Sequence, residues 1–208
     1  LYGQVEVKKR ESFMNQNSLK FFLEIGTSDF DTNLEFIDSG NWRGIMVEPS
    51  PPFFKNIKKR ASQSNYHYNL ILENSVISNI NGFVDFAVSK DVEGWQRGIS
   101  TVISDSHEGT CLYNLGNNKE VSYDRVIKAP CLTLDTLLDK YNITSLDYLK
   151  VDTEGHELNI FKNYSWRVKP NFLKIEKKHI DETVLVNILE EKGYKVYLEI
   201  DDLYGILI

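Results

Sequence analysis

The feature that most constrains the fold is a regular alternation of short apolar runs and amphipathic segments between residues 19 and 72. The apolar runs at 19–26, 44–47 and 68–72 have the length and character of buried strands. The segments between them carry apolar side chains at helical spacing, and the first of these segments ends at Gly40. Strand–helix–strand–helix–strand with short connections predicts a parallel, right-handed, doubly wound sheet.

A similar pattern returns in the C-terminal half. A helix capped by Thr133 is expected over 133–138, and a strand at 146–151 is followed by a helix that ends near Phe161. A strand, a helix and two antiparallel closing strands are expected at 172–176, 182–192, 194–200 and 203–208. The sequence therefore predicts an α/β fold with a mostly parallel doubly wound sheet and an antiparallel C-terminal strand pair, in one domain over residues 19–208. Residues 1–18 are polar and aperiodic, and we expect an arm or short helix there.

The middle of the chain is less regular. Residues 83–88 alternate between apolar and polar as a strand does. The stretch 89–118 is rich in Gly, Ser and Asn, which predicts a long loop. Loops of this length inside a compact domain are more often functional or mobile than structural, so this one could serve as a lid.

The charge balance and the cysteine count narrow the class of protein. The formal net charge is −6, whereas proteins that grip phosphate backbones normally carry a basic face, so nucleic acid is not expected as a partner. No apolar run reaches the roughly 18–20 residues of a membrane span, and no signal peptide opens the chain. The 2 cysteines are too few for a disulfide framework. They fit a reducing compartment, and we expect a cytoplasmic protein.

Polar residues follow most of the predicted strands. Ligands of open α/β sheets bind beyond the carboxyl ends of the strands, near the point where the strand order reverses. The residues at those ends are therefore the candidates for a site, namely Glu24, Gly26, Glu48, Asn74, Ser75, Asp152, Glu154, Glu176 and His179.

Glu48 is the strongest of these candidates. It lies 22 residues after Gly26, at the end of the second predicted strand. A glycine after the first strand and an acid at this distance suit a nucleotide-like cofactor, whose ribose hydroxyls the carboxylate accepts. Taken alone, Glu48 could also cap a helix or face solvent.

The loop after Gly26 discriminates between cofactors. A nicotinamide dinucleotide needs a glycine-rich cradle for its pyrophosphate, but this loop has one glycine and two acids, Asp29 and Asp31. The acids would repel a pyrophosphate and suit a sulfonium and an ammonium group. S-adenosylmethionine is therefore the expected cofactor, and a nucleotide-dependent oxidoreductase is disfavoured.

The end of the strand at 146–151 carries the candidate catalytic groups. Asp152 and Glu154 could orient or deprotonate a hydroxyl, or hold a divalent cation with His156 nearby. The alternative for both acids is N-capping of a helix that starts near Gly155. His179 could be a general base or a solvated side chain. A bound divalent metal is compatible with these residues but is not predicted.

Four segments of the chain together resemble the FkbM family of S-adenosylmethionine-dependent methyltransferases. They are 22–26 (Phe-Leu-Glu-Ile-Gly), 47–49 (Val-Glu-Pro), 133–137 (Thr-Leu-Asp-Thr-Leu) and 146–157. The most specific part is 150–157, which is similar to the family's Lys-(Ile/Val)-Asp-x-Glu-Gly-x-Glu signature. The resemblance covers about residues 19–208. It implies a class I methyltransferase (Rossmann-like) fold and O-methylation of a hydroxyl, commonly on a sugar, a glycan or a polyketide-type product.

The resemblance also implies roles for individual residues. Glu24, Gly26 and Thr27 would meet the methionine part, Glu48 the ribose, Asn74 or Ser75 the adenine, and Asp152 and Glu154 the methyl group and the acceptor, with His179 as a candidate base. The chain departs from the family at Phe30, where a second glycine is usual.

The hypothesis from the sequence is an O-methyltransferase that acts on a hydroxyl of a sugar or glycan. The alternatives are a binding module for the same cofactor without catalysis and a methyltransferase for polyketide-type or other small molecules. The chain begins at Leu1, so one domain of a longer polypeptide, for example beside a glycosyltransferase, is a further expectation.

Overall fold

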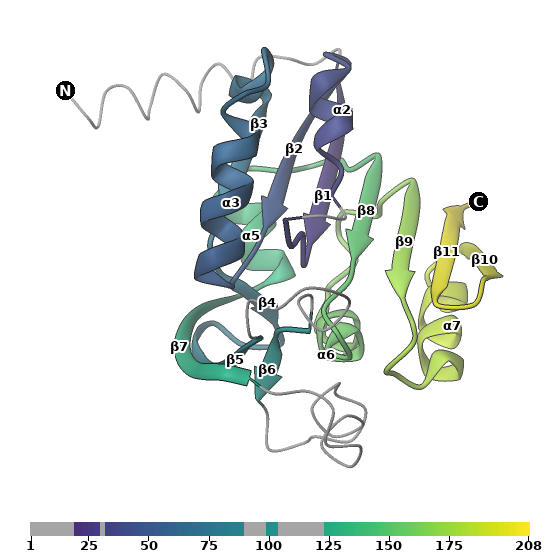
Figure 1. The fold of residues 1–208 in the computed structure, drawn as a ribbon. Helices are drawn as coiled ribbons and strands as arrows, with labels where there is room; N and C mark the ends of the chain where they lie inside the picture. The colour runs from purple at the N-terminus through teal and green to yellow at the C-terminus, as the bar shows by residue number, and fades with distance from the viewer. Residues whose placement is uncertain (1–18, 30–31, 90–98, 104–122) are drawn as a thin grey trace.

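A seven-stranded sheet forms the centre of the molecule (Figure 1). The computed structural model describes residues 19–29, 32–89, 99–103 and 123–208. The sheet has the order β10-β11-β9-β8-β1-β2-β3. Its strands are β1 (Lys20–Ile25), β2 (Trp42–Val47), β3 (Leu70–Glu73), β8 (Tyr148–Val151), β9 (Phe172–Glu176), β10 (Tyr194–Leu198) and β11 (Asp202–Leu207).

The pairing of the strands confirms the predicted architecture. β1 lies parallel to both β2 and β8, β2 is parallel to β3, and β8 is parallel to β9. β11 is antiparallel to β9 and to β10, as predicted for the C-terminal pair. The chain runs outward from β1 to β3 and then returns to the other side of β1 with β8. The order therefore reverses between β1 and β8, which is where a ligand site is expected.

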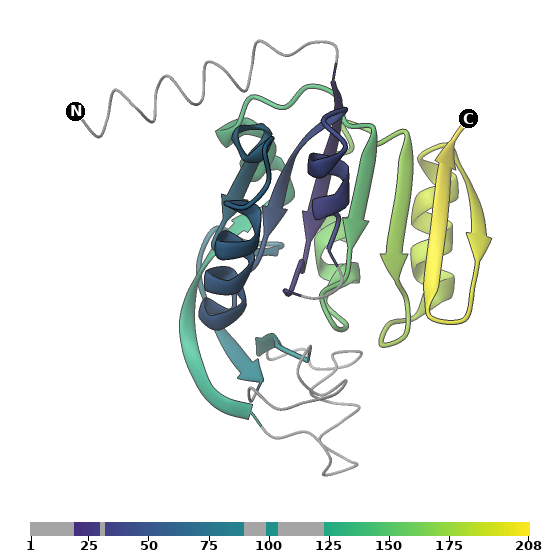
Figure 2. The ribbon, with the colours of Figure 1, turned by 45° about the horizontal axis from the view of Figure 1, so that its top comes forward.

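Helices cover both faces of this sheet (Figure 2). They are α2 (Leu34–Asp38), α3 (Pro51–Ala61), α5 (Leu134–Lys140), α6 (Glu157–Asn163) and α7 (Glu182–Glu191), with a short 3₁₀ helix at His67–Asn69. Successive strand side chains point to opposite faces. Leu23 and Ile25 accordingly pack with residues of α5, α6 and α7. Phe22 and Met46 pack with residues of α2 and α3 on the other face. None of the described helices is both long and apolar enough to cross a membrane.

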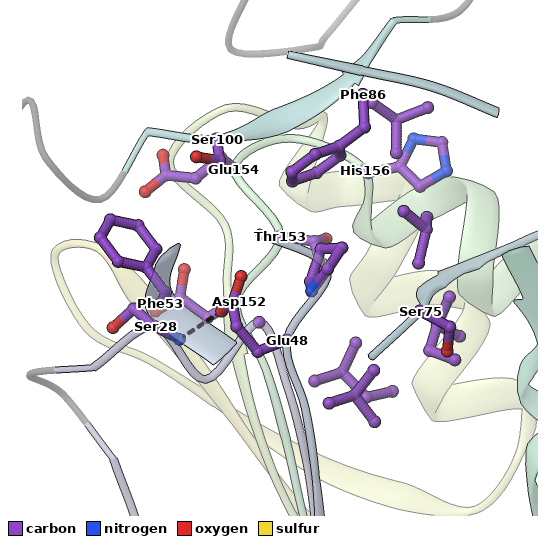
Figure 3. A pocket seen from close by; sticks show the side chains of 17 residues that line it. Ser28, Glu48, Phe53, Ser75, Phe86, Ser100, Asp152, Thr153, Glu154 and His156 are labelled. Carbon is purple, nitrogen blue, oxygen red and sulfur yellow. Dashed lines mark hydrogen bonds between the residues drawn. The ribbon is translucent and has the colours of Figure 1, made fainter. Parts of the chain in front are cut away.

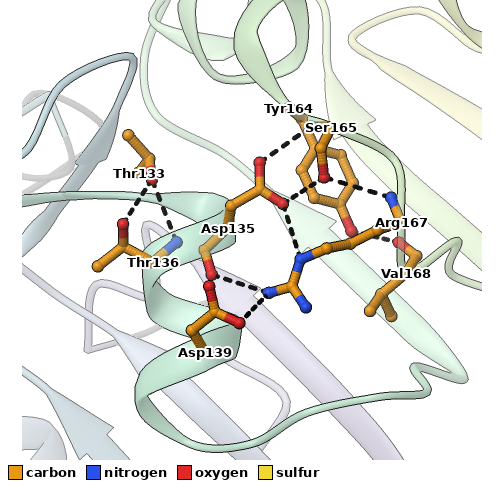
Figure 4. Close-up of polar contacts among 8 residues, drawn as sticks. All are labelled: Thr133, Asp135, Thr136, Asp139, Tyr164, Ser165, Arg167 and Val168. Atoms are coloured by element: carbon orange, nitrogen blue, oxygen red, sulfur yellow. Dashed lines mark hydrogen bonds and ion pairs between the residues drawn. The ribbon is translucent and has the colours of Figure 1, made fainter.

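The N-terminus of α5 is fixed by polar contacts (Figure 4). The Thr133 hydroxyl accepts a hydrogen bond from the Thr136 amide at 3.1 Å, which confirms the predicted cap. Asp135 accepts bonds from the Ser165 amide at 2.9 Å and from Arg167 Nε at 3.2 Å. These contacts tie α5 to the segment that follows α6, and they hold the helices on this face of the sheet together.

A second, four-stranded sheet lies beyond the carboxyl ends of β1, β2 and β8 (Figures 1 and 2). Its order is β4-β7-β5-β6, and it has a small apolar cluster that includes Phe86, Val102 and Ala129. Its strands are β4 (Val76–Ser78), β5 (Gly82–Ser89), β6 (Thr101–Ile103) and β7 (Tyr123–Thr133).

The second sheet differs from the sequence prediction, which has only the strand at 83–88. Part of the predicted long loop is the strand β6, and β7 was not expected at all. Alternate positions of β7 are not consistently apolar, and it contains Pro130, so its local sequence does not indicate a strand. Residues 90–98 and 104–118 of the predicted loop, the arm at 1–18 and Phe30 lie outside the described residues. The lid, the arm and the single-domain division therefore stay predictions.

Candidate functional site

A pocket lies between the two sheets, at the reversal of strand order. Its empty volume is about 740 Å³, which includes the solvent at its open mouth. The ends of β1, β2 and β8 form its floor, and Phe86 and Val102 of the second sheet form part of its wall (Figure 3). None of the described residues that line it is Lys or Arg. Acids, hydroxyl groups and the imidazole of His156 supply its polar side chains, so the described lining offers no Lys or Arg to hold a phosphate.

The candidate residues from the sequence divide into two groups. The structure brings Gly26, Glu48, Ser75, Asp152 and Glu154 together in the lining of this pocket. Glu24, Thr27, Asn74 and His179 are not in the lining, but they contact it or lie directly behind it.

Gly26 allows two strand ends to touch. Its φ is +79°, and a Cβ at this position would lie 1.7 Å from the backbone oxygen of Asp152. The Gly26 amide donates to the Val47 oxygen at 3.0 Å, and the Asp152 amide donates to the Ile25 oxygen at 3.0 Å. Only glycine fits here, because every other residue adds a Cβ and disfavours a positive φ.

Glu48 is a buried carboxylate that joins two loops. Its Oε2 accepts a hydrogen bond from the Ser28 amide at 2.6 Å (Figure 3), and its Oε1 accepts one from the Ser50 amide at 2.7 Å. Burial, with smaller contributions from the charges of Asp29 and Glu24, raises the pKa of Glu48 to about 8, and the two bonds oppose this rise. A carboxylate has about four acceptor positions, so Glu48 can accept two more hydrogen bonds from a ligand.

Glu24 and Thr27 support the floor of the pocket from behind. Glu24 is fully buried, its Oε1 lies 3.4 Å from Lys150 Nζ, and its Oε2 accepts from the Asn33 amide at 3.0 Å. Burial raises the pKa of Glu24 to about 7, and Lys150 opposes this rise. Thr27 is fully buried, and its amide donates to the Val47 oxygen at 3.2 Å.

Asn74 and Ser75 have different surroundings although they are adjacent. The exposed Asn74 donates from Nδ2 to the Glu48 backbone oxygen at 2.7 Å, so it positions the Glu48 loop from outside the pocket. Ser75 is buried and lines the pocket. Its hydroxyl has no hydrogen-bond partner among the described residues, which leaves it available to a ligand. Of the two residues expected near an adenine, Ser75 is therefore the one that lines the pocket.

The alternative reading of Asp152 and Glu154 as helix caps is wrong. α6 begins at Glu157, and its N-cap His156 makes no side-chain cap bond. The Glu157 carboxylate instead accepts from the Thr153 amide at 2.7 Å and from the Gly155 amide at 3.1 Å. Asp152 and Glu154 both line the pocket, and Glu154 has a positive φ of 56°. Their carboxylates are consequently part of the site rather than of the helix.

His179 reaches the site through Glu154. Its Nε2 lies 3.5 Å from Glu154 Oε2, although the two residues follow different strands. Burial and the neighbouring Lys178 lower the pKa of His179, so the imidazole is favoured in its neutral form. A neutral imidazole can accept a proton, and it can also bind a metal.

The sequence did not identify several residues of the pocket wall. Phe53 follows the Pro51-Pro52 start of α3, Phe86 and Val102 come from the second sheet, and Ser100 directly precedes β6. These side chains look like ordinary core or loop residues in the sequence. They form a wall only because the second sheet lies beyond the carboxyl ends of β1 and β2.

His156 is the other buried titratable group of the lining, and it bonds on both ring nitrogens. Nε2 lies 2.7 Å from the Ser78 hydroxyl, and Nδ1 lies 3.0 Å from Asn159 Nδ2. Burial lowers its pKa from 6.5 to about 4. The imidazole is therefore neutral at pH 7 and connects α6 to the second sheet.

The depressed pKa of His156 predicts acid sensitivity. Between pH 6.5 and about 4 the unfolded chain binds a proton that the folded protein does not, so the free energy of unfolding falls as the pH falls. In the wild type the free energy of unfolding should fall by on the order of 3 kcal/mol across this interval because of His156, and in His156→Gln this part of the decrease should be absent. Urea denaturation at several pH values measures it, with His67→Gln at an exposed histidine as the control. Equal acid sensitivity of the wild type and His156→Gln would contradict the assignment.

Comparisons with known proteins assign the family. The family model described as "Methyltransferase FkbM domain" matches residues 20–196. Among solved structures, the chain is similar to precorrin-6y C5,15-methyltransferase from Geobacter metallireducens GS-15, with 14% identity over 98% of this chain and 86% of that one and a TM-score of 0.48. It is also similar to magnesium protoporphyrin IX methyltransferase from Synechocystis PCC 6803, with 7% identity over 99% and 77% of the two chains and a TM-score of 0.45. No curated protein matches.

Both TM-scores are below 0.5, so the assignment depends on the family model and not on these two structures. The match covers most of the chain and includes the strand ends that form the pocket. The sheet order, with an antiparallel β11 between β9 and β10, is the predicted class I methyltransferase arrangement. The chain therefore belongs to the FkbM family of methyltransferases, with S-adenosylmethionine as the methyl donor.

Proposed function

We propose that this chain is an O-methyltransferase that transfers the methyl group of S-adenosylmethionine to a hydroxyl of a sugar or glycan. The observation that carries the proposal is Glu48, a buried carboxylate with free acceptor capacity in the floor of the pocket. Around it, the described lining contains the acids Asp152 and Glu154 and no Lys or Arg, which suits a cofactor with a sulfonium and an ammonium group.

The donor would lie across the ends of β1 and β2. In this arrangement Glu48 accepts hydrogen bonds from both ribose hydroxyls, and Gly26 allows the methionine part to approach the backbone. Phe53 and Ile77 offer apolar surface to the adenine, and the Ser75 hydroxyl offers it a hydrogen bond. The methyl group then points toward Asp152 at the end of β8.

The acceptor would approach from the side of Glu154. Its oxygen attacks the methyl carbon in line with the sulfur, the new C–O bond forms as the C–S bond breaks, and the cofactor leaves as a neutral thioether. The hydroxyl proton passes to Asp152 or His179 as general base, a contribution of roughly 10²–10⁴-fold. Carboxylates at this mouth can accept several hydrogen bonds, which fits an acceptor with many hydroxyls.

Calorimetric titration with S-adenosylhomocysteine tests donor binding, and saturable binding is the expected result. Mass spectrometry after incubation with the donor and a panel of sugars, glycosides and polyketide-type alcohols tests transfer. We expect a glycoside product heavier by one methylene unit. The absence of binding at millimolar concentration would reject the cofactor site. Binding without any methylated product would favour a non-catalytic module, and methylation of polyketide-type alcohols alone would reject the sugar acceptor.

Asp152→Asn tests the site of the chemistry. We expect kcat to fall by roughly 10²-fold or more, because an amide cannot take the proton. Asp38→Asn, at an exposed position of α2, is the matched control. Wild-type kcat in Asp152→Asn would exclude Asp152 as the base and leave His179 as the remaining candidate.

A further inference from the structure

The loops that follow β8 and β9 bring three metal-binding side chains together. One ligand atom each from Glu154, Glu176 and His179 lies within 4.8 Å of the other two. The parallel register of β8 and β9, with Val151 opposite Ile175, places these strand ends side by side. We propose that Glu154, Glu176 and His179 bind one divalent cation at the mouth of the pocket.

The surroundings of Glu176 distinguish this group from an ordinary ion pair. Its Oε2 is buried and has no hydrogen-bond partner among the described residues. A buried carboxylate oxygen without a partner is costly, and a cation is the partner that offsets this cost best. Burial is the main cause that raises the pKa of Glu176, and the nearby negative charges of Asp152 and Glu154 add to this rise.

The neighbouring lysines do not neutralise this charge. Lys174 pairs with Asp202 at 3.1 Å, Lys177 with Glu182 at 2.7 Å, and Lys150 with Glu24 at 3.4 Å. Lys178 lowers the pKa of Glu176, but its side chain is exposed to solvent. The described charges around Glu176 therefore leave room for a cation.

The set of donors indicates the kind of cation. Two carboxylates and one imidazole combine hard oxygen ligands with a nitrogen ligand, which suits Mn²⁺ and also Mg²⁺. Three protein ligands leave other coordination positions open to water or to a ligand. Because Glu154 lines the pocket, some of these positions are expected to face it.

The cation would have a role in the proposed function. A hydroxyl oxygen bound to the cation is held near the methyl group and loses its proton more easily. The proton would go to Asp152, while Glu154 and His179 would hold the cation. This role rests on the proposed O-methylation, whereas the binding of the cation does not.

Titration of the EDTA-treated full chain with Mn²⁺, without any methyl donor, tests the site. Electron paramagnetic resonance of free Mn²⁺ and calorimetry should both detect one saturable site per chain. We expect Glu176→Gln and His179→Gln to weaken binding at least about tenfold, because each removes one ligand. Glu191→Gln and His67→Gln change exposed residues of the same types and should bind as the wild type does.

Thermal unfolding separates a cation site from an ion pair that only stabilises the loops. Without metal, Glu176→Gln should be at least as stable as the wild type, because it replaces a partly buried carboxyl that lies beside other acids with a neutral amide of the same size. With Mn²⁺, the melting temperature of the wild type should rise and that of Glu176→Gln should not. No saturable binding, or binding that Glu176→Gln and His179→Gln leave unchanged, would overturn the proposal.

Separate measurements distinguish the two proposals. Mn²⁺ binding without S-adenosylhomocysteine binding would reject the proposed function and keep the cation site. Methyl transfer that is unaffected by EDTA, in a chain that does not bind Mn²⁺, would keep the function and reject the cation site.

Discussion

Glu48→Gln is expected to weaken the binding of S-adenosylhomocysteine by at least about 100-fold. A hydrogen bond to a buried charged group contributes about 1.5–3 kcal/mol, and the two ribose hydroxyls would make two of them. Glu48 now accepts hydrogen bonds from the backbone amides of Ser28 and Ser50. The side-chain NH₂ group of Gln would face one of these two donors and could not accept from it. The loop after β1 should consequently be less well positioned. Calorimetry measures the affinity, and circular dichroism verifies the fold.

Glu35→Gln is the matched control, because Glu35 is an exposed acid in the first turn of α2. Its affinity should equal that of the wild type. A folded Glu48→Gln protein with wild-type affinity would exclude Glu48 from the ribose site.

The raised pKa of Glu48 adds a pH dependence to the same prediction. In the unliganded protein the carboxyl loses its proton near pH 8, and the ionised form is the one that attracts a sulfonium and accepts two hydroxyls. The affinity of the wild type for S-adenosylmethionine should therefore rise as the pH rises through about 8. The stability of the unliganded protein should change in the opposite direction. A carboxyl with a raised pKa adds to the free energy of unfolding. This contribution is fully present below its unfolded pKa of 4.5 and is lost as the pH rises through about 8.

Gly26→Ala is expected to lower the free energy of unfolding by about 2–5 kcal/mol and to abolish donor binding. A positive φ costs a residue with a Cβ about 1–2 kcal/mol, and overpacking in a tight site costs about 1–3 kcal/mol more. The atom that the Cβ meets is the backbone oxygen of Asp152, at 1.7 Å, and it cannot move without moving the end of β8. Urea denaturation measures the stability, and calorimetry with S-adenosylhomocysteine measures the binding.

Gly82→Ala separates the two costs. Gly82 also has a positive φ, of 127°, but a Cβ there would have nothing within 4 Å. The Gly82→Ala protein should therefore lose only the conformational part of the stability, about 1–3 kcal/mol. If Gly26→Ala were as stable as Gly82→Ala, the close contact with Asp152 would not limit this position.

The central sheet could be predicted because its information is local. Each strand of its first half is a short apolar run, and the short connections permit only a right-handed parallel crossover. The register of β1 and β8 could not be predicted. It places Glu24 directly opposite Lys150, so Glu24 becomes a buried ion pair behind the pocket although it stands near a strand end in the sequence.

The second sheet could not be predicted, because its strands depend on partners far away in the chain. β5 pairs with β7, and Phe86 lies opposite Ile127 across a long intervening segment. Strand preference depends on such neighbours more than on the residue itself. The apolar wall of the pocket, with Phe86 and Val102, was missed for the same reason.

The sequence by itself determined the class of fold, the family and the residues at the strand ends, because apolar periodicity and short motifs are properties of adjacent residues. Only the tertiary structure decided which of those residues meet. In the tertiary structure Gly26, Glu48 and Asp152 line one pocket, and Glu24 lies behind it. The tertiary structure also brought Glu176 and His179 to Glu154, because distances between side chains on different strands follow from register and packing.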